Sequence, residues 1–172
     1  MNFAERVLAR LNETVIQESL RIAARDVIID MRKRIFDDGL NSEGQPIGKY
    51  STRPLLILKK DMPKVVRGTS SSATAVFFQG GYDQFKRENG YTKVNWRMFG
   101  NLMRDFATPK ETLAGKSLTY SVKNSENQEK LDYLESHFAK NGSTISLSKK
   151  ERENITKTFN FELQKRLFPP ND

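Results

Sequence analysis

The single histidine, His137, is the residue best suited to bind a metal or to act as a general base at neutral pH. It lies in a stretch of helical periodicity beside Phe138, with Glu135 two positions before it. One imidazole among scattered carboxylates does not make a closed coordination set. The chain contains no cysteine, so thiolate nucleophiles, thiolate metal sites and disulfides are excluded. The sequence therefore predicts no catalytic residue, no metal and no cofactor.

Two other patterns in the sequence partly match known phosphate-binding or catalytic motifs. Gly115, Lys116 and Ser117 reproduce the last three positions of a phosphate-binding loop, but the first glycine of that motif is missing. Asp26 and Asp30 lie one helical turn apart among several arginines, where ion pairs on a solvated surface are expected. A hydrolase or nuclease is accordingly the least favoured of three functional hypotheses.

The positive charge is unevenly distributed along the chain. Residues 39–124 contain fourteen bases and six acids, whereas the segments on either side are balanced. Such a local excess favours a polyanionic neighbour, either nucleic acid or an acidic protein surface, but it also fits a solvated face that keeps the protein soluble. If DNA is bound, contact with its backbone without sequence readout is expected. The candidate partner or DNA contacts are Lys59, Lys60, Lys64, Arg67, Trp96 and Arg97.

A long helix is predicted over residues 1–38, because apolar residues recur every three to five positions without glycine or proline. Gly39 follows, where a left-handed cap is expected. A helix of about 36 residues would span about 54 Å, more than a compact domain of this size needs. We therefore expect the helix to bend, or to project and meet another subunit.

The remaining segments predict a single α+β domain over residues 1–172. Residues 39–80 form a basic, irregular loop region with a possible short strand at 75–78. Residues 81–124 contain short helices and a strand at 117–122, where polar and apolar side chains alternate. Residues 125–167 form two C-terminal helices, the second opened by a capping box at Ser148 and Glu151. The expected fold is a long N-terminal helix, a small antiparallel sheet and two C-terminal helices.

The segment from Val94 to Phe106 has the densest group of large apolar side chains. Spacings of three, four and three place four of them on one helical stripe, for which core packing is the simplest interpretation. Asn95 is a candidate cap for this helix, and Gly100 indicates a bend or a close backbone approach. Trp96 and Arg97 lie at its open end, where a subunit contact is expected. The stripe consists of Trp96, Phe99, Met103 and Phe106.

The order of several short motifs resembles the virion-morphogenesis, or tail-completion, proteins of tailed bacteriophages. After the long helix comes a loop with the pattern D/N-x-x-G-x-P, although Ile47 stands where that family has an aromatic residue. A Gly-Gly-Tyr element, a glycine-centred apolar segment, an alternating strand and an I-x-L-S-x-x-[DE] helix start follow. The matching positions are Asn41, Gly44, Pro46, Gly80, Gly81, Tyr82, Phe85, Val94, Met98, Gly100, Leu102, Met103, Phe106, Ile145, Leu147, Ser148 and Glu151.

This resemblance implies a structural, non-enzymatic protein of the virion, assembled in the host cytoplasm. It would act as a subunit of a homo-oligomeric ring at the head–tail junction or the top of the tail. Its expected partners are neck or connector proteins, tail-tube or tail-terminator proteins, and DNA passing through the channel. No membrane is implied, and no apolar run approaches the 18 residues of a membrane span. The alternative hypothesis is a sequence-nonspecific DNA-binding module that uses residues 39–124.

Overall fold

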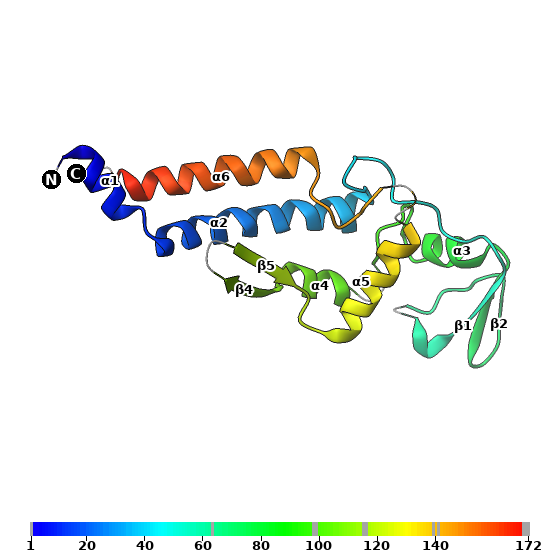
Figure 1. Cartoon of the computed structure of the whole chain (residues 1–172). Coiled ribbons are helices and arrows are strands. Elements are labelled where there is room, and N and C mark those ends of the chain that lie inside the picture. The colour runs from blue at the N-terminus through cyan, green and yellow to red at the C-terminus, as the bar shows by residue number, and fades with distance from the viewer. Residues whose placement is uncertain are drawn as a thin grey trace.

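The computed structural model describes residues 2–62, 64–97, 100–114, 117–138, 140 and 142–169. The fold is α+β, as the sequence predicts, with helices at both ends of the chain and two small antiparallel sheets between them (Figure 1). Within these residues, no helix has both the length and the apolar character needed to cross a membrane. The helices are α1 (Phe3–Arg10), α2 (Glu13–Arg32), η1 (Lys33–Asp38), η2 (Lys59–Asp61), α3 (Gly81–Glu88), α4 (Asn101–Ala107), α5 (Ser125–Phe138) and α6 (Lys149–Leu167). The strands are β1 (Leu55–Leu58), β2 (Ser70–Ser71), β3 (Ala75–Phe78), β4 (Lys110–Ala114) and β5 (Ser117–Ser121).

Helices α2 and α6 lie side by side and form a long arm, which we call the helical arm (Figure 1). They run antiparallel, because Glu18 near the start of α2 meets Arg166 near the end of α6, with 3.4 Å between carboxylate and guanidinium. Helix α1 continues the arm, and Arg10 Nη1 donates to the carbonyl of Leu167 at 3.0 Å. Both ends of the chain therefore lie together at the tip of the arm.

The long helix predicted over residues 1–38 is interrupted once. Asn12 has an extended conformation, and its side chain accepts from the Val15 N–H at 3.0 Å, so it caps a second helix. This break is one of the two expected outcomes, a bend in the helix. The final turn, η1, is π-helical and ends at Gly39, whose φ of 67° is the expected left-handed cap. A Cβ at Gly39 would lie 2.5 Å from the Val94 carbonyl, so this backbone approach also requires glycine.

Two apolar clusters fill the interior. The larger joins the inner faces of α2, η1, α4 and α5, with Phe36 and Phe106 in edge-to-face contact at 5.6 Å. Glu111 on β4 holds the β4–β5 hairpin to α2. Its carboxylate forms salt bridges with Arg21 Nε at 2.9 Å and with Arg25 Nη2 at 3.0 Å. The smaller cluster lies inside what we call the β lobe, residues 55–88, at the end of the molecule away from the termini. It contains Met62, Val76, Phe78 and Phe85.

The β lobe corrects the second part of the irregular loop predicted over residues 39–80, whereas no helix or strand is present in its first part, residues 39–54. Strand β3, which the sequence suggested, is the centre of a three-stranded sheet in the order β1-β3-β2. The apolar run Leu55–Leu58 is strand β1, paired antiparallel with β3, so that Leu56 faces Phe77. Strand β4 was missed as well, because KETLA carries little alternation and is fixed mainly by its partner β5.

The continuous helix predicted over residues 94–106 is wrong. Helix α4 begins only at Asn101, because Trp96 has φ 48° and Gly100 has φ 79°, both left-handed conformations that break a right-handed helix. Asn95 is buried and does not cap α4; instead its side chain accepts from the Arg97 N–H at 3.2 Å. Met98 and Phe99 lie outside the described residues. The core interpretation of the stripe is confirmed for Trp96, which is buried in the larger cluster, and for Met103 and Phe106, which are partly buried and pack against it.

Candidate functional site

Four of the six predicted contact residues gather on the β lobe, and we call them the basic edge: Lys59, Lys60, Lys64 and Arg67. The short turn η2 places the first two directly after β1, and the Lys59 N–H donates to the Thr74 carbonyl at 2.9 Å. Lys60, Lys64 and Arg67 are exposed, and Lys59 is half-buried. Within the described part of the chain, none of the four forms a salt bridge. Their charge is thus available to a partner.

Exposed apolar side chains accompany the basic edge. Strand β1 turns Ile57 inward against the smaller cluster and leaves Leu56 and Leu58 on the outer face. Leu56 is 62% exposed, and Val65 is also exposed. Strand β1 pairs with β3 on one side only, so it is an edge strand of its sheet. The lobe therefore combines apolar area and positive charge, which suits a protein surface with acidic groups around an apolar centre.

Trp96 does not join this surface. The Trp96 side chain is 7% exposed and lies 6.5 Å from the ring of Phe138, inside the larger cluster. Arg97 is half-buried. Trp96 is therefore a core residue rather than the contact residue that the sequence suggested, and the six candidates do not form one site.

A buried lysine holds this segment in place, and no sequence pattern distinguishes it from a surface lysine. Lys86, on α3, is 2% exposed, and its ammonium donates to the Arg97 carbonyl and, at 3.4 Å, to Asn95 Oδ1. The ammonium also lies over the ring of Tyr91, 4.2 Å from the centroid. Burial, with a smaller contribution from the positive charge of Arg97, lowers the pKa of Lys86 to about 8. Lys86 thus fastens the non-helical segment before α4 to the β lobe.

This lysine makes stability depend on pH. Between about pH 8 and pH 10 the unfolded chain keeps a proton on Lys86 that the folded chain has released, so the free energy of unfolding rises with pH. Above pH 10 it falls again, because burial raises the pKa values of Tyr50 and Tyr82 and these phenols ionise first in the unfolded chain. Urea unfolding at about pH 7.5 and about pH 9.5 measures the rise. We expect Lys86→Met to abolish it and Lys60→Met to retain it. A rise of equal size in Lys86→Met contradicts the assignment.

Arg34 and Glu151 form a second buried polar group, which sequence spacing did not reveal. Arg34 Nε donates to Glu151 Oε1 at 2.8 Å, and the side chains are only 10% and 4% exposed. The guanidinium also donates to the carbonyls of Leu40, Thr144 and Ser146. Glu151 in turn accepts from the Ser148 N–H at 2.7 Å, which completes the predicted capping box. The pair therefore joins the start of η1 to the start of α6, a structural role.

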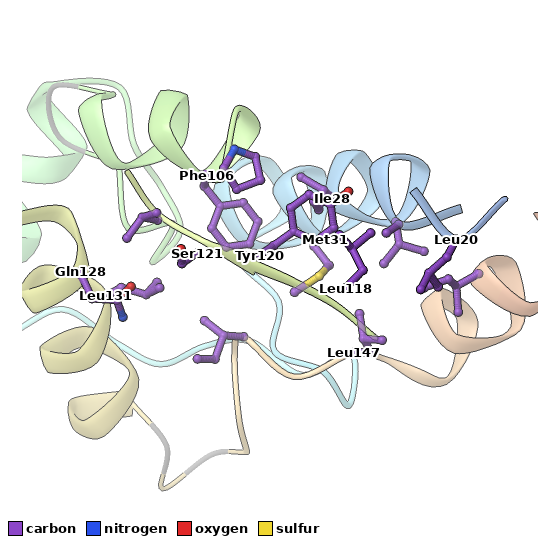
Figure 2. A pocket seen from close by; sticks show the side chains of 16 residues that line it. Leu20, Ile28, Met31, Phe106, Leu118, Tyr120, Ser121, Gln128, Leu131 and Leu147 are labelled. Atoms are coloured by element: carbon purple, nitrogen blue, oxygen red, sulfur yellow. The ribbon is translucent and has the colours of Figure 1, made fainter. Parts of the chain in front are cut away.

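A groove of about 410 Å³ lies between α2, the β4–β5 hairpin, α5 and the loop before α6. Figure 2 shows Ile28 and Met31 from α2, Phe106 from α4 and Leu118 from β5 around this space (Figure 2). All of the sixteen lining residues except Tyr120, Ser121 and Gln128 are apolar. The groove offers a surface for an apolar group and does not bring acids and bases together.

The outer side of α5 carries the opposite charge to the basic edge. Glu126, Glu129 and Asp132 are exposed there, and we call them the acidic face. Tyr133 beside them is 66% exposed and stacks on His137 with 5.8 Å between ring centroids. His137 is thus part of an exposed aromatic pair, and the described residues contain no group of three or more acids or histidines that could hold a metal ion.

Comparison of the chain with protein-family models, with curated proteins and with solved structures finds no match. The basic edge, the acidic face and the exposed apolar side chains are the features from which a function can be inferred.

Proposed function

We propose that this chain is a non-enzymatic virion protein of a tailed phage. It acts as a ring subunit at the head–tail junction or the top of the tail, and it completes the tail or joins it to the head. The observation that carries the proposal is the two-ended shape of the molecule, with the helical arm at one end and the β lobe at the other. A subunit of this shape can contact neighbours in the ring and the structures above and below it.

Exposed apolar side chains at both ends support this role. On and beside the arm, Leu8, Ile29 and Phe161 are each more than 60% exposed, and on the lobe Leu56 is exposed to a similar extent. Burying apolar surface in an assembly contributes about 25 cal/mol per Å². Single exposed apolar residues are common on monomers, so this observation supports the proposal only together with the shape of the molecule.

The proposed partners follow from the same surfaces and from the resemblance in motif order. Copies of the chain surround the channel, and neck or connector proteins and tail-tube or tail-terminator proteins adjoin the ring. The basic edge supplies the charge for an acidic protein surface or for DNA in the channel. The virion is the proposed location, after assembly in the host cytoplasm.

Joining of heads to tails in vitro tests the proposal. Cells infected by a phage that lacks this chain should accumulate DNA-filled heads and separate tails. Adding the purified chain to that lysate should produce joined, infectious particles, which electron microscopy and plaque counts detect. Complete particles formed without the chain would rule the proposal out.

The basic edge is expected to be required for joining and not for folding. Lys59→Glu combined with Lys60→Glu changes side chains that form no salt bridge in the described part of the chain, so melting should stay close to wild type. The yield of joined particles should fall, because the partner surface meets the wrong charge. Lys149→Glu with Lys150→Glu is the matched control: it makes the same change in net charge on exposed residues of the first turn of α6, where acids are favourable. Normal particle yield from the Lys59/Lys60 variant would show that the basic edge does not dock.

The bases of the basic edge, which form no salt bridge with any residue that the structure describes, also favour a second candidate, a sequence-nonspecific DNA-binding module. In that case a monomeric chain should bind duplexes of unrelated sequence with equal affinity. The logarithm of its binding constant should fall with the logarithm of salt concentration by about 0.9 per phosphate contacted. Absence of duplex binding at low salt excludes this candidate.

A further inference from the structure

Folding separates charges that are balanced in the C-terminal part of the sequence. The acids Glu126, Glu129 and Asp132 lie on α5, whereas most exposed bases of the same segment lie on α6, and Lys140 lies between the two helices. Lys130 is the only base on α5, and its ammonium is 3.6 Å from the Glu126 carboxylate, an exposed pair that contributes little. The molecule thus has an acidic face on α5 and a basic edge on the β lobe, on different elements.

The two surfaces also resemble each other in composition. The acidic face surrounds an exposed aromatic side chain, Tyr133, and the basic edge surrounds the exposed Leu56 and Leu58. An apolar centre with a charged rim is the usual composition of a protein interface, and tyrosine is enriched there. Opposite charge on the two rims provides the complementarity that selects one partner and sets the register.

We propose that the basic edge of one copy docks on the acidic face of the next copy. This proposal rests on the proposed ring function and identifies the surfaces through which neighbouring subunits meet. The two patches differ, so the contact is head-to-tail, and its repetition closes a ring if the rotation allows. Leu56 and Leu58 then pack against Tyr133, while Lys59 and Lys60 meet Glu129 and Asp132.

The basic edge suits this contact better than the bases of α6. Its four bases lie within nine residues, with one exposed acid, Asp61, among them, beside exposed leucines and a valine. The exposed bases of α6 are distributed from Lys149 to Lys165, about 24 Å of helix, with Glu153 among them. The basic edge is therefore the more concentrated of the two groups of bases, and it also carries the exposed apolar side chains.

Complementary charge reversal tests the contact with purified full-length chains. One variant carries Lys59→Glu and Lys60→Glu, the other Glu129→Lys and Asp132→Lys. Sedimentation velocity at low salt should show self-association of the wild-type chain, weakened by added salt. Each variant alone should associate more than about 100-fold more weakly, because like charges then face each other at every contact. An equimolar mixture should recover association, since alternating copies again bring opposite charges together, and one chain carrying all four changes should recover it too.

Several outcomes overturn the proposal. They are a wild-type chain that stays monomeric, either variant associating as the wild type does, or a mixture that does not recover. The Lys149→Glu, Lys150→Glu variant should associate as the wild type does. Weakened association of this variant would mean that the acidic face binds the bases of α6 rather than the basic edge. The head–tail joining assay distinguishes this result from failure of the function. If the chain joins heads to tails but does not associate through these surfaces, the ring function stands and the proposed contact is rejected. If the chain associates through these surfaces but is not needed for joining, the proposed function is rejected.

Discussion

Replacing Arg34 by methionine, with Glu151 left in place, is expected to lower the free energy of unfolding by about 3–5 kcal/mol. The reason is the carboxyl group that remains, because Glu151 is nearly fully buried and would lose its guanidinium partner. The carbonyls of Thr144 and Ser146 would lose their guanidinium donor as well. Urea unfolding followed by circular dichroism measures the loss.

The double replacement Arg34→Met with Glu151→Met removes both charges and keeps the site filled with apolar side chains. It should recover part of the loss, because no unpaired charge remains. Recovery should be incomplete, since Glu151 also caps α6 and a lost cap costs about 1 kcal/mol. Arg25→Met is the matched control: Arg25 is largely exposed in its pair with Glu111, so its loss should stay below about 1 kcal/mol. Equal stability of wild type and Arg34→Met would contradict the structural role of the pair.

Phe36→Ala is expected to cost about 3–5 kcal/mol, the usual range for a phenylalanine truncated in a core. Phe36 is 1% exposed and contacts Phe106 edge to face, so the change leaves a cavity where η1 meets α4. Thermal and urea unfolding should both show the decrease. If the variant is insoluble, Phe36→Leu, which retains much of the volume, should fold and cost less.

Phe161→Ala is the matched control for this prediction. It makes the same change on α6, but Phe161 is 64% exposed, so its effect on stability should stay within about 0.5 kcal/mol. A comparable loss from both replacements would mean that the larger cluster is not the stabilising core.

Features set by neighbouring residues could be predicted from the sequence. The Ser148–Glu151 capping box depends on side chains three positions apart, and the structure contains both of its hydrogen bonds. Gly39 ends the N-terminal helical segment in the predicted left-handed conformation. The break at Asn12 depends on an equally local cap, but the apolar stripe continues across it and therefore predicts one uninterrupted helix.

Features set by distant residues could not be predicted. Arg34 and Glu151 are 117 positions apart, so no helical or strand periodicity predicts that they form a pair. Strand β1 has no polar alternation, and its partner β3 is needed to identify it. The apolar stripe around Trp96 predicted a helix, but Lys86 holds the Arg97 carbonyl and Gly100 stands in a left-handed conformation. Tertiary contacts thus override the local pattern there.

The candidate surface was predicted only in part. Composition indicated the excess of bases over residues 39–124, and the structure leaves Lys60, Lys64 and Arg67 exposed on one lobe, whereas their role as contacts stays a prediction. It could not locate the acidic face, since acids on α5 and bases on α6 cancel in a count along the sequence. The prediction that Trp96 is a surface contact was wrong. A tryptophan beside a basic residue occurs both in cores and on surfaces, so the local sequence does not distinguish the two.

The antiparallel arm has a consequence for synthesis on the ribosome. Helix α2 emerges early, but the helix that covers it, α6, emerges more than a hundred residues later. At about 5–20 residues per second, the 117 residues between Arg34 and Glu151 take about 6–23 s. During that interval the β lobe, whose strands are close in sequence, can form, whereas the apolar face of α2 lacks its final cover. Closing of the arm is therefore the last folding event, and the nascent chain is most exposed to chaperones and aggregation just before it.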